Sequence, residues 1–279
     1  MCCAAAPCFG HNGYHEELRH VDEQLAAKPD DATLWMQRGH LDVLHGDWQG
    51  AMIDLEKADR LAPGKLLTGY VRGRALALGG QFEAGKAVLD DFIQAHGTHP
   101  DAYVARARIL LKLNRPADAA KDFAAAIERA KRPEPDLFVE NADALVATGR
   151  NSEAIQVLGA GITKLGDIPQ LTLKALDLEV SAGQFDAALL RVEAMRKAAP
   201  RPEPWMAKRA ELLAQAGRKA EAQAAWTELR ERIAAMPVLE RGSFAMSRLT
   251  EQAETALAAL ASHSPNKTTQ STPGHTTSR

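Results

Sequence analysis

One spacing constrains this chain more than any other feature of its sequence. A residue suited to a left-handed backbone conformation recurs at steps of 34, 34, 35, 34 and 34 residues. These residues are Gly46, Gly80, Asn114, Gly149, Gly183 and Gly217. Five residues after each stands Ala or Gly, and four further on stands a large apolar residue, from Leu55 to Trp226. This fixed period predicts a stack of helix–turn–helix hairpins.

Small residues recur on the first helix of each predicted hairpin. With Ala32 as position 1, position 8 carries Gly39, Gly73, Ala107, Ala142, Leu176 and Ala210. Small residues at positions 8 and 20 let the two helices of a hairpin approach to about 8–10 Å between axes. Leu176 departs from this rule, and we therefore expect the fifth hairpin to be splayed or rotated.

The first repeat shows the pattern in full. Positions 4, 8, 20, 24, 27 and 32 are Trp35, Gly39, Ala51, Leu55, Ala58 and Pro63. This pattern resembles the tetratricopeptide repeat (TPR) family over residues 32–236. The resemblance implies an all-α, right-handed superhelical solenoid of about six repeats. The repeats are expected near 32–65, 66–99, 100–133, 135–168, 169–202 and 203–236.

Stacked hairpins need a cover at each end, because each hairpin buries only one layer of its neighbour. Leu18, Val21 and Leu25 share one face of a predicted helix over 13–28, and a second capping helix is expected over 240–261. The solenoid with its caps is therefore expected over 13–261. The segment 262–279 is rich in Ser, Thr and Pro without an apolar period, which predicts a disordered tail.

The three cysteines all lie within the first eight residues, which excludes a disulfide framework for the rest of the chain. Residues 1–12 resemble the end of a truncated signal peptide, with cleavage expected after Gly10. The opening from His11 to Glu16 is similar to that of some exported bacterial TPR proteins. We therefore expect a periplasmic or secreted protein. A frayed terminus of a cytoplasmic protein stays open as the alternative.

The composition excludes several classes of function. Lys plus Arg number 34 against 36 for Asp plus Glu, so the net charge is close to zero. Long-range electrostatic attraction to nucleic acid or to a membrane surface is therefore not expected. No segment of about 20 apolar residues is present, and we expect no membrane insertion. No phosphate loop, zinc-protease pattern or nucleophile elbow occurs. We expect neither an enzyme nor a cofactor.

The nine histidines raise the possibility of a metal site. His96 and His99 share a loop but have no third ligand close in sequence, so exposed histidines without a metal are the preferred interpretation. His11 and His15 are weak candidates for Cu(II) if His11 becomes the first residue of the mature chain. Against this, Asn12-Gly13 favours a turn. The alternative function is therefore a copper-binding accessory protein.

The concave groove is the preferred functional surface. In the TPR family the first helices line it through positions 2, 5, 9 and 12. The groove residues expected here are Met36, His40, Tyr70, Arg74, Asp101, Arg108, Val139, Asp143, Leu173, Asp177 and Glu211. Position 9 is basic or titratable in the first half of the array and acidic in the second, which suits a protein or peptide partner. The alternative is that these charges pair internally along the stack.

Position by position, the sequence argues against the carboxylate clamp by which some TPR proteins hold chaperone tails. The matching positions carry Met36, His40, Val71, Asp101 and Ala105, and these do not supply the Lys, Asn and Arg side chains of that clamp. The preferred function is a non-enzymatic scaffold that binds a protein or peptide and assembles an envelope or exported complex. The identity of the partner and the oligomeric state do not follow from the sequence.

Overall fold

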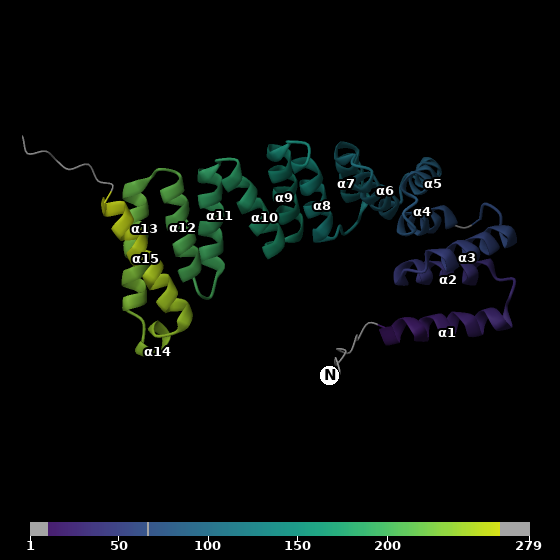
Figure 1. Ribbon diagram of the computed structural model, residues 1–279, viewed down its shortest axis with the longest axis horizontal. Helices are drawn as coiled ribbons and strands as arrows, with labels where there is room; N and C mark the ends of the chain where they lie inside the picture. The colour runs from purple at the N-terminus through teal and green to yellow at the C-terminus, as the bar shows by residue number, and fades with distance from the viewer. Residues whose placement is uncertain (1–10, 66, 263–279) are drawn as a thin grey trace, which may run out of the picture. The chain divides into compact units, whose positions relative to one another are not determined.

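The computed structural model of the chain describes residues 11–65 and 67–262. Over these residues the chain forms fifteen α-helices and no strand, which confirms the predicted all-α class (Figure 1). The chain divides into two compact units, Met1–Ala175 and Leu176–Arg279, and the division falls inside α10 (Pro169–Ser181). The repeat spacing in the sequence does not change at this division.

The helices follow one another as antiparallel hairpins. The first unit contains α1 (His11–Ala27), α2 (Ala32–His45), α3 (Trp48–Leu61), α4 (Thr68–Leu78), α5 (Phe82–Ala95), α6 (Pro100–Lys112), α7 (Pro116–Arg129), α8 (Pro135–Val146) and α9 (Asn151–Leu165). The second contains α11 (Phe185–Ala198), α12 (Glu203–Gln215), α13 (Lys219–Ala234), α14 (Val238–Arg241) and α15 (Phe244–Ser262). Pairs such as α2 with α3 and α12 with α13 form the repeats.

The residues at the repeated spacing end the first helix of each hairpin in the predicted way. Gly46 follows α2 with φ of 92°, and Asn114 has φ of 55°, as the only residue other than glycine with positive φ in the described chain. The equivalent glycines in the other repeats also have positive φ. A left-handed residue here lets the chain reverse at once into the second helix.

Close approach of the two helices depends on the small residues. A Cβ atom on Gly73 would lie 2.5 Å from Cγ of Leu89, and one on Gly39 would lie 3.1 Å from the carbonyl oxygen of Ala51. The large residues that follow fill the core, since Leu55, Leu89 and Phe123 have no exposed surface. The small residue at position 8 thus allows the close approach of the two helices, and the large residue at position 24 fills the apolar core between them.

Leu176 is the exception at the small position. Its side chain is 1% exposed and packs with Ala188, Val192 and Leu212 in the core of the second unit. The core therefore accommodates a large residue where the other hairpins have a small one. The splay expected for this hairpin stays a prediction.

Each end of the array is covered by a helix. Val21 and Leu25 of α1 pack against Leu34 and Leu41 of α2. Helix α1 already begins at His11, so the expected turn at Asn12-Gly13 is wrong. The first backbone N–H groups of a helix have no partner within the helix, and Asn and Gly are well tolerated there.

At the other end, α15 buries Met246 and Ala253 against the core that contains Trp226 and Leu229. The short helix α14 before it is a feature that the sequence pattern does not predict. Residues 1–10 and 263–279, which include the expected signal-like segment and most of the expected tail, lie outside the described residues.

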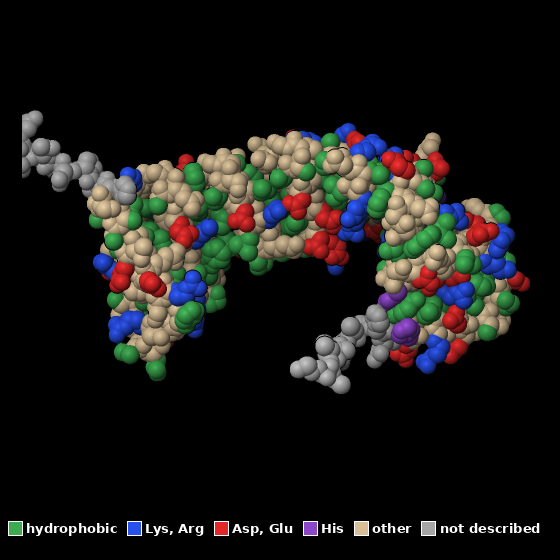
Figure 2. Space-filling view, viewed as in Figure 1, with side chains coloured by type: hydrophobic (Ala, Val, Ile, Leu, Met, Phe, Trp, Pro, Cys, Tyr) green, Lys and Arg blue, Asp and Glu red, His purple; other side chains and the backbone are tan. Residues whose placement is uncertain are grey.

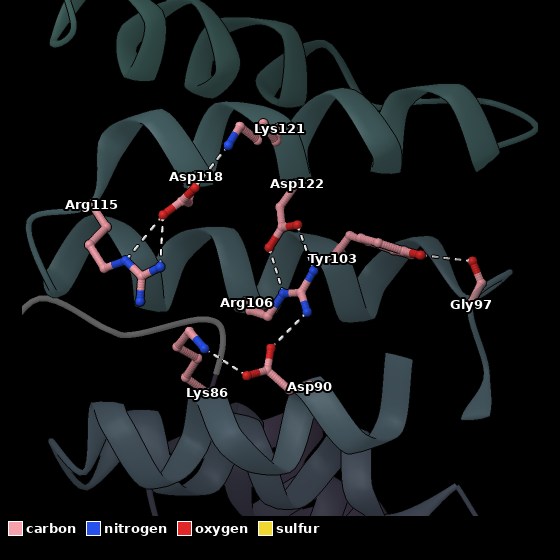
Figure 3. Close-up of polar contacts among 9 residues, drawn as sticks. All are labelled: Lys86, Asp90, Gly97, Tyr103, Arg106, Arg115, Asp118, Lys121 and Asp122. Atoms are coloured by element: carbon pink, nitrogen blue, oxygen red, sulfur yellow. Dashed lines mark hydrogen bonds and ion pairs between the residues drawn. The ribbon is translucent and has the colours of Figure 1, made fainter. Parts of the chain in front are cut away.

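Two partly buried arginines link successive helices in an equivalent way. Arg106 donates two hydrogen bonds of 2.7 Å to Asp122 on α7 and one of 2.7 Å to Asp90 on α5 (Figure 3). Arg38, 68 residues earlier, donates to Asp54 on α3 and to Asp22 on α1 at 2.6–2.8 Å. Each guanidinium thus joins its own hairpin to the preceding second helix, with bidentate geometry on one carboxylate.

Replacing Arg106 tests the strength of this link. We expect Arg106→Leu to lower the free energy of unfolding by about 2–4 kcal/mol, because Asp122, only 6% exposed, loses its counter-charge. Arg115→Leu is the matched control. Arg115 pairs with Asp118 at the surface, where an ion pair contributes less than about 1 kcal/mol. Urea unfolding would measure both, and equal small losses would contradict the expectation.

A buried carboxyl group lies where α1 meets α2. Asp42 is 7% exposed and accepts a hydrogen bond of 3.4 Å from the hydroxyl of Tyr14, whose ring stacks on His45. Burial, followed by the charges of Asp54 and Asp47, raises the pKa of Asp42 from its ordinary value of 3.8 to about 6. The folded chain therefore holds this proton more tightly than the unfolded chain does.

This raised pKa predicts how stability depends on pH. Below pH 3.8 the group is protonated in both states, and between 3.8 and about 6 stability falls as the unfolded chain releases the proton first. Above pH 6 the ionised carboxyl costs about 1–3 kcal/mol. Asp42→Asn should therefore melt higher than the parent above pH 6 and alike below 3.8. Asp91→Asn, on the exposed side of α5, should leave melting unchanged at both pH values.

Candidate partner-binding cleft

A cleft of about 550 Å³ lies in the first unit, along α4, α6 and the start of α8. These are first helices of consecutive hairpins, and α4 packs beside α6. The cleft is lined by apolar residues from five helices and the side chains of six charged residues. The apolar residues include Val43, Leu78, Phe82, Val104, Ile109 and Leu137. The charged residues are Arg74, Asp101, Arg108, Lys112, Glu134 and Asp136.

The apolar wall is partly open to solvent. Leu78, at the end of α4, is 46% exposed, whereas Val104 and Leu137 are both 8% exposed and belong to the helix packing. An apolar pocket with a few placed charges is the usual form of a recognition site. The cleft therefore offers an apolar side chain of a partner a place to bury.

Arg74 is, with Lys112, one of the two cations of this cleft without an ion pair among the described residues. Its guanidinium lies 5.5 Å from the centre of the Tyr70 ring, and Nη1 donates a hydrogen bond of 3.4 Å to the Tyr70 hydroxyl. Among the described residues it forms no ion pair with a carboxylate. The ring holds the guanidinium in place by a cation–π contact without neutralising its charge.

The neighbouring position 9 residues are neutralised within the stack. Arg108 donates two hydrogen bonds of 2.7 and 2.9 Å to Glu140, and Lys174 lies 2.6 Å from Asp143. Both partners, Glu140 and Lys174, stand at position 6 of the following repeat. For these two residues the structure supports internal pairing, the alternative that the sequence left open.

Pairing between position 9 and position 6 of the following repeat also explains why Arg74 forms no ion pair. Position 6 of the repeat that follows Arg74 is Ala105, which lines the cleft and carries no charge. For His40, one repeat earlier, the corresponding position 6 is Val71, which also carries no charge. Burial, and then the charge of Arg74, lower the pKa of His40, which favours its neutral form. Arg74 is therefore the charged side chain of the predicted basic half that has no carboxylate partner among the described residues.

The remaining charges of the cleft are arranged along the helices. Asp101 and Asp136 are the second residues of α6 and α8, where carboxylates favour the positive end of the helix dipole. Lys112 is the last residue of α6, about 16 Å from Asp101 along the helix axis. One rim of the cleft is thus acidic, and the other carries a lysine. Acidic and basic side chains also gather over the α6–α8 part of the surface in Figure 2.

Four of the predicted groove residues meet in this cleft: Tyr70, Arg74, Asp101 and Arg108. The other predicted residues of the first unit lie outside the cleft lining; they are Met36, His40, Val139, Asp143 and Leu173. Asp177 and Glu211 belong to the second unit. Glu211 accepts a hydrogen bond of 2.5 Å from Gln252 of α15, so the capping helix contacts this predicted groove position.

Several cleft residues were not named from the sequence. Val43 and Ala77 stand at position 12, and the family pattern could have identified both. Phe82 begins a second helix and Glu134 lies in the connector before α8, and no repeat position indicated either. These two residues enter the cleft only because of how the helices pack.

The histidines do not form a metal site in the described part of the chain. No group of three or more His, Cys, Asp or Glu residues there could hold a metal ion. His96 and His99 lie beside the ring of Phe92, at centroid distances of 4.8 and 5.6 Å, in an aromatic cluster with Tyr70. The side chain of His11 and residues 1–10 lie outside what the structure describes, so cleavage after Gly10 stays a prediction.

Comparison with solved structures identifies the fold. The C-terminal part of a TPR repeat-containing protein from Cytophaga hutchinsonii is 16% identical, with a TM-score of 0.54, and the match covers 92% of this chain and 94% of that one. Yeast Tom70 is 18% identical, with a TM-score of 0.50, over 81% of this chain and 46% of its own. Naa15/Naa10 bound to HypK-THB gives 14% and 0.52, over 91% of this chain and 38% of that one.

These likenesses show that the chain has the fold of TPR proteins, as its repeat pattern indicates. No protein-family model matches the chain, and no curated protein matches it. None of the described helices is long and apolar enough to span a membrane.

Proposed function

We propose that this protein is a non-enzymatic scaffold that binds a segment of a partner protein in the cleft along α4, α6 and α8. The observation that carries the proposal is Arg74, a cation without a carboxylate partner among the described residues, in a cleft with apolar walls. A charged group that is not used inside the stack is available to a ligand. The TPR fold supports a protein as that ligand, because one similar structure, Naa15/Naa10, is bound to HypK-THB.

The chemistry of the cleft defines the segment that fits best. A large apolar side chain would bury against Leu78, Phe82 and Ile109, and a carboxylate of the same segment would pair with Arg74. Basic residues of the partner would lie toward Asp101 and Asp136 at the opposite rim. A planar, bidentate contact suits an Arg and a carboxylate, so an Asp or Glu next to an apolar anchor is the expected motif.

A substitution at position 6 tests this proposal. Ala105→Glu places a carboxylate where Glu140 stands one repeat later, and it should pair with Arg74 and compete with the partner's carboxylate. We expect peptides selected from a random library to bind at least about tenfold more weakly to Ala105→Glu and to Arg74→Glu than to the parent. Fluorescence anisotropy with the selected peptides would measure the affinities.

Two variants serve as matched controls for this experiment. Ala105→Gln has nearly the same size as Ala105→Glu without the charge, and it should retain most of the binding. Arg60→Glu reverses an exposed charge on α3, away from the cleft lining, and should have no effect. Undiminished binding to both Ala105→Glu and Arg74→Glu, or selected peptides without carboxylates, would contradict a site centred on Arg74.

We also propose that the partner belongs to an exported or envelope complex. The support is the similarity of residues His11 to Glu16 to the opening of exported bacterial TPR proteins. Fractionation of cells that express the gene from its native locus should place the protein in the periplasm, with His11 as its first residue. Recovery from the cytoplasm with Met1 intact would instead favour the cytoplasmic alternative.

A further inference from the structure

The turn between α13 and α15 in the second unit exposes a concentrated apolar patch. Val238, Leu239 and Phe244 are 74%, 92% and 80% exposed, and they lie within seven residues of one another. They are three of the four most exposed large apolar side chains of the described chain. Single exposed apolar residues are common on protein surfaces, whereas a contiguous group marks an interaction site. These three side chains are called the tip below.

Two hollows adjoin the segment that carries the tip. The first, of about 700 Å³, is lined by Met206, Met236 and Met246 together with Pro237 and six charged residues. The second, of about 710 Å³, lies between α13 and α15 and includes Ile233 and Val238. Pockets of about 300 Å³ already accommodate small ligands, so either hollow has room for an apolar side chain. Methionine side chains are flexible and adapt to the shape of what they bury.

The charges around the tip are balanced. Arg201, Arg241 and Arg248 form no ion pair with a carboxylate among the described residues, and Glu228, Glu240 and Glu251 form none with a basic group there. Arg248 instead lies 5.9 Å from the centre of the Phe244 ring. Figure 2 shows apolar and basic side chains together at the α14 end. Five arginines and six glutamates line the two hollows, so one copy of this surface can supply counter-charges to another.

We propose that this surface joins two copies of the chain. In a two-fold interface the same patch faces itself, so a surface that holds both a projecting apolar tip and adjacent hollows is self-complementary. The tip of one copy enters a hollow beside the tip of the other, and Leu239 and Phe244 become buried in both directions. This association concerns a surface of the second unit and does not depend on the cleft at Arg74.

The same features argue against a lipid surface as the occupant. Glu228, Glu240 and Glu251 lie around the tip and would be repelled by anionic headgroups. A bilayer would also leave the two hollows unfilled. A second copy uses the apolar tip, the hollows and both signs of charge.

The oligomeric state of the full chain tests this proposal. Sedimentation velocity and light scattering across a wide range of concentrations should show a mass that rises from 30.1 kDa for one chain toward twice that value. Leu239→Glu and Phe244→Glu should each weaken the dimer by at least about tenfold, because each places a carboxylate in the apolar centre of the interface. Both residues are exposed, so circular dichroism should show unchanged helicity.

Leu190→Glu is the matched control, because Leu190 is 75% exposed on α11 and lies outside both hollows. It should leave the dimer intact. A monomer at every concentration, or a dimer that neither tip variant weakens, would overturn the proposal. Binding of the parent to vesicles of phosphatidylglycerol, lost in Leu239→Glu, would assign the tip to lipid and would also overturn it.

Discussion

The close approach of two helices within each hairpin is the contact on which the rest of the structure depends. At Gly73 there is no space for even a Cβ atom beside Leu89, and Gly39 lies against the backbone of Ala51. Helices this close form a thin layer whose two faces both need cover. The next hairpin covers one face and the previous hairpin or a capping helix covers the other, which is why α1 and α15 belong to the fold.

Apolar packing between such layers does not by itself fix how one hairpin sits on the next. Arg38 and Arg106 restrict the orientation, because each binds one carboxylate of its own hairpin and one of the preceding helix. A planar guanidinium meets two carboxylates in only a few orientations. The fourth repeat has Asn141 at the equivalent position, 2% exposed and with its Oδ1 unpartnered, so this link is not repeated there.

The sequence predicted most of the fold because the residues that determine the hairpin lie within one repeat and recur in every repeat. Left-handed residues, small contact positions and large core positions are properties of one hairpin, and periodicity reports them directly. The arginine links were missed although Arg38 and Arg106 stand 68 residues apart with carboxylates at matching distances. The tip at Leu239 was missed because it lies outside the repeat. Phe82 and Glu134 enter the cleft through packing between repeats, which a pattern within one repeat does not contain.

In the candidate site, the position of a residue in its repeat does not by itself decide whether its charge is available to a ligand. The residue that it meets in the following repeat also matters. The family pattern predicts that position 9 faces the groove, yet three residues at that position differ in what they can offer a ligand. Arg108 and Asp143 are neutralised by position 6 of the following repeat, whereas Arg74 meets Ala105 and keeps its charge. The charge available to a partner is therefore set by pairs of positions in adjacent repeats. In a stack of nearly identical hairpins, a missing internal partner distinguishes a recognition residue from a structural one.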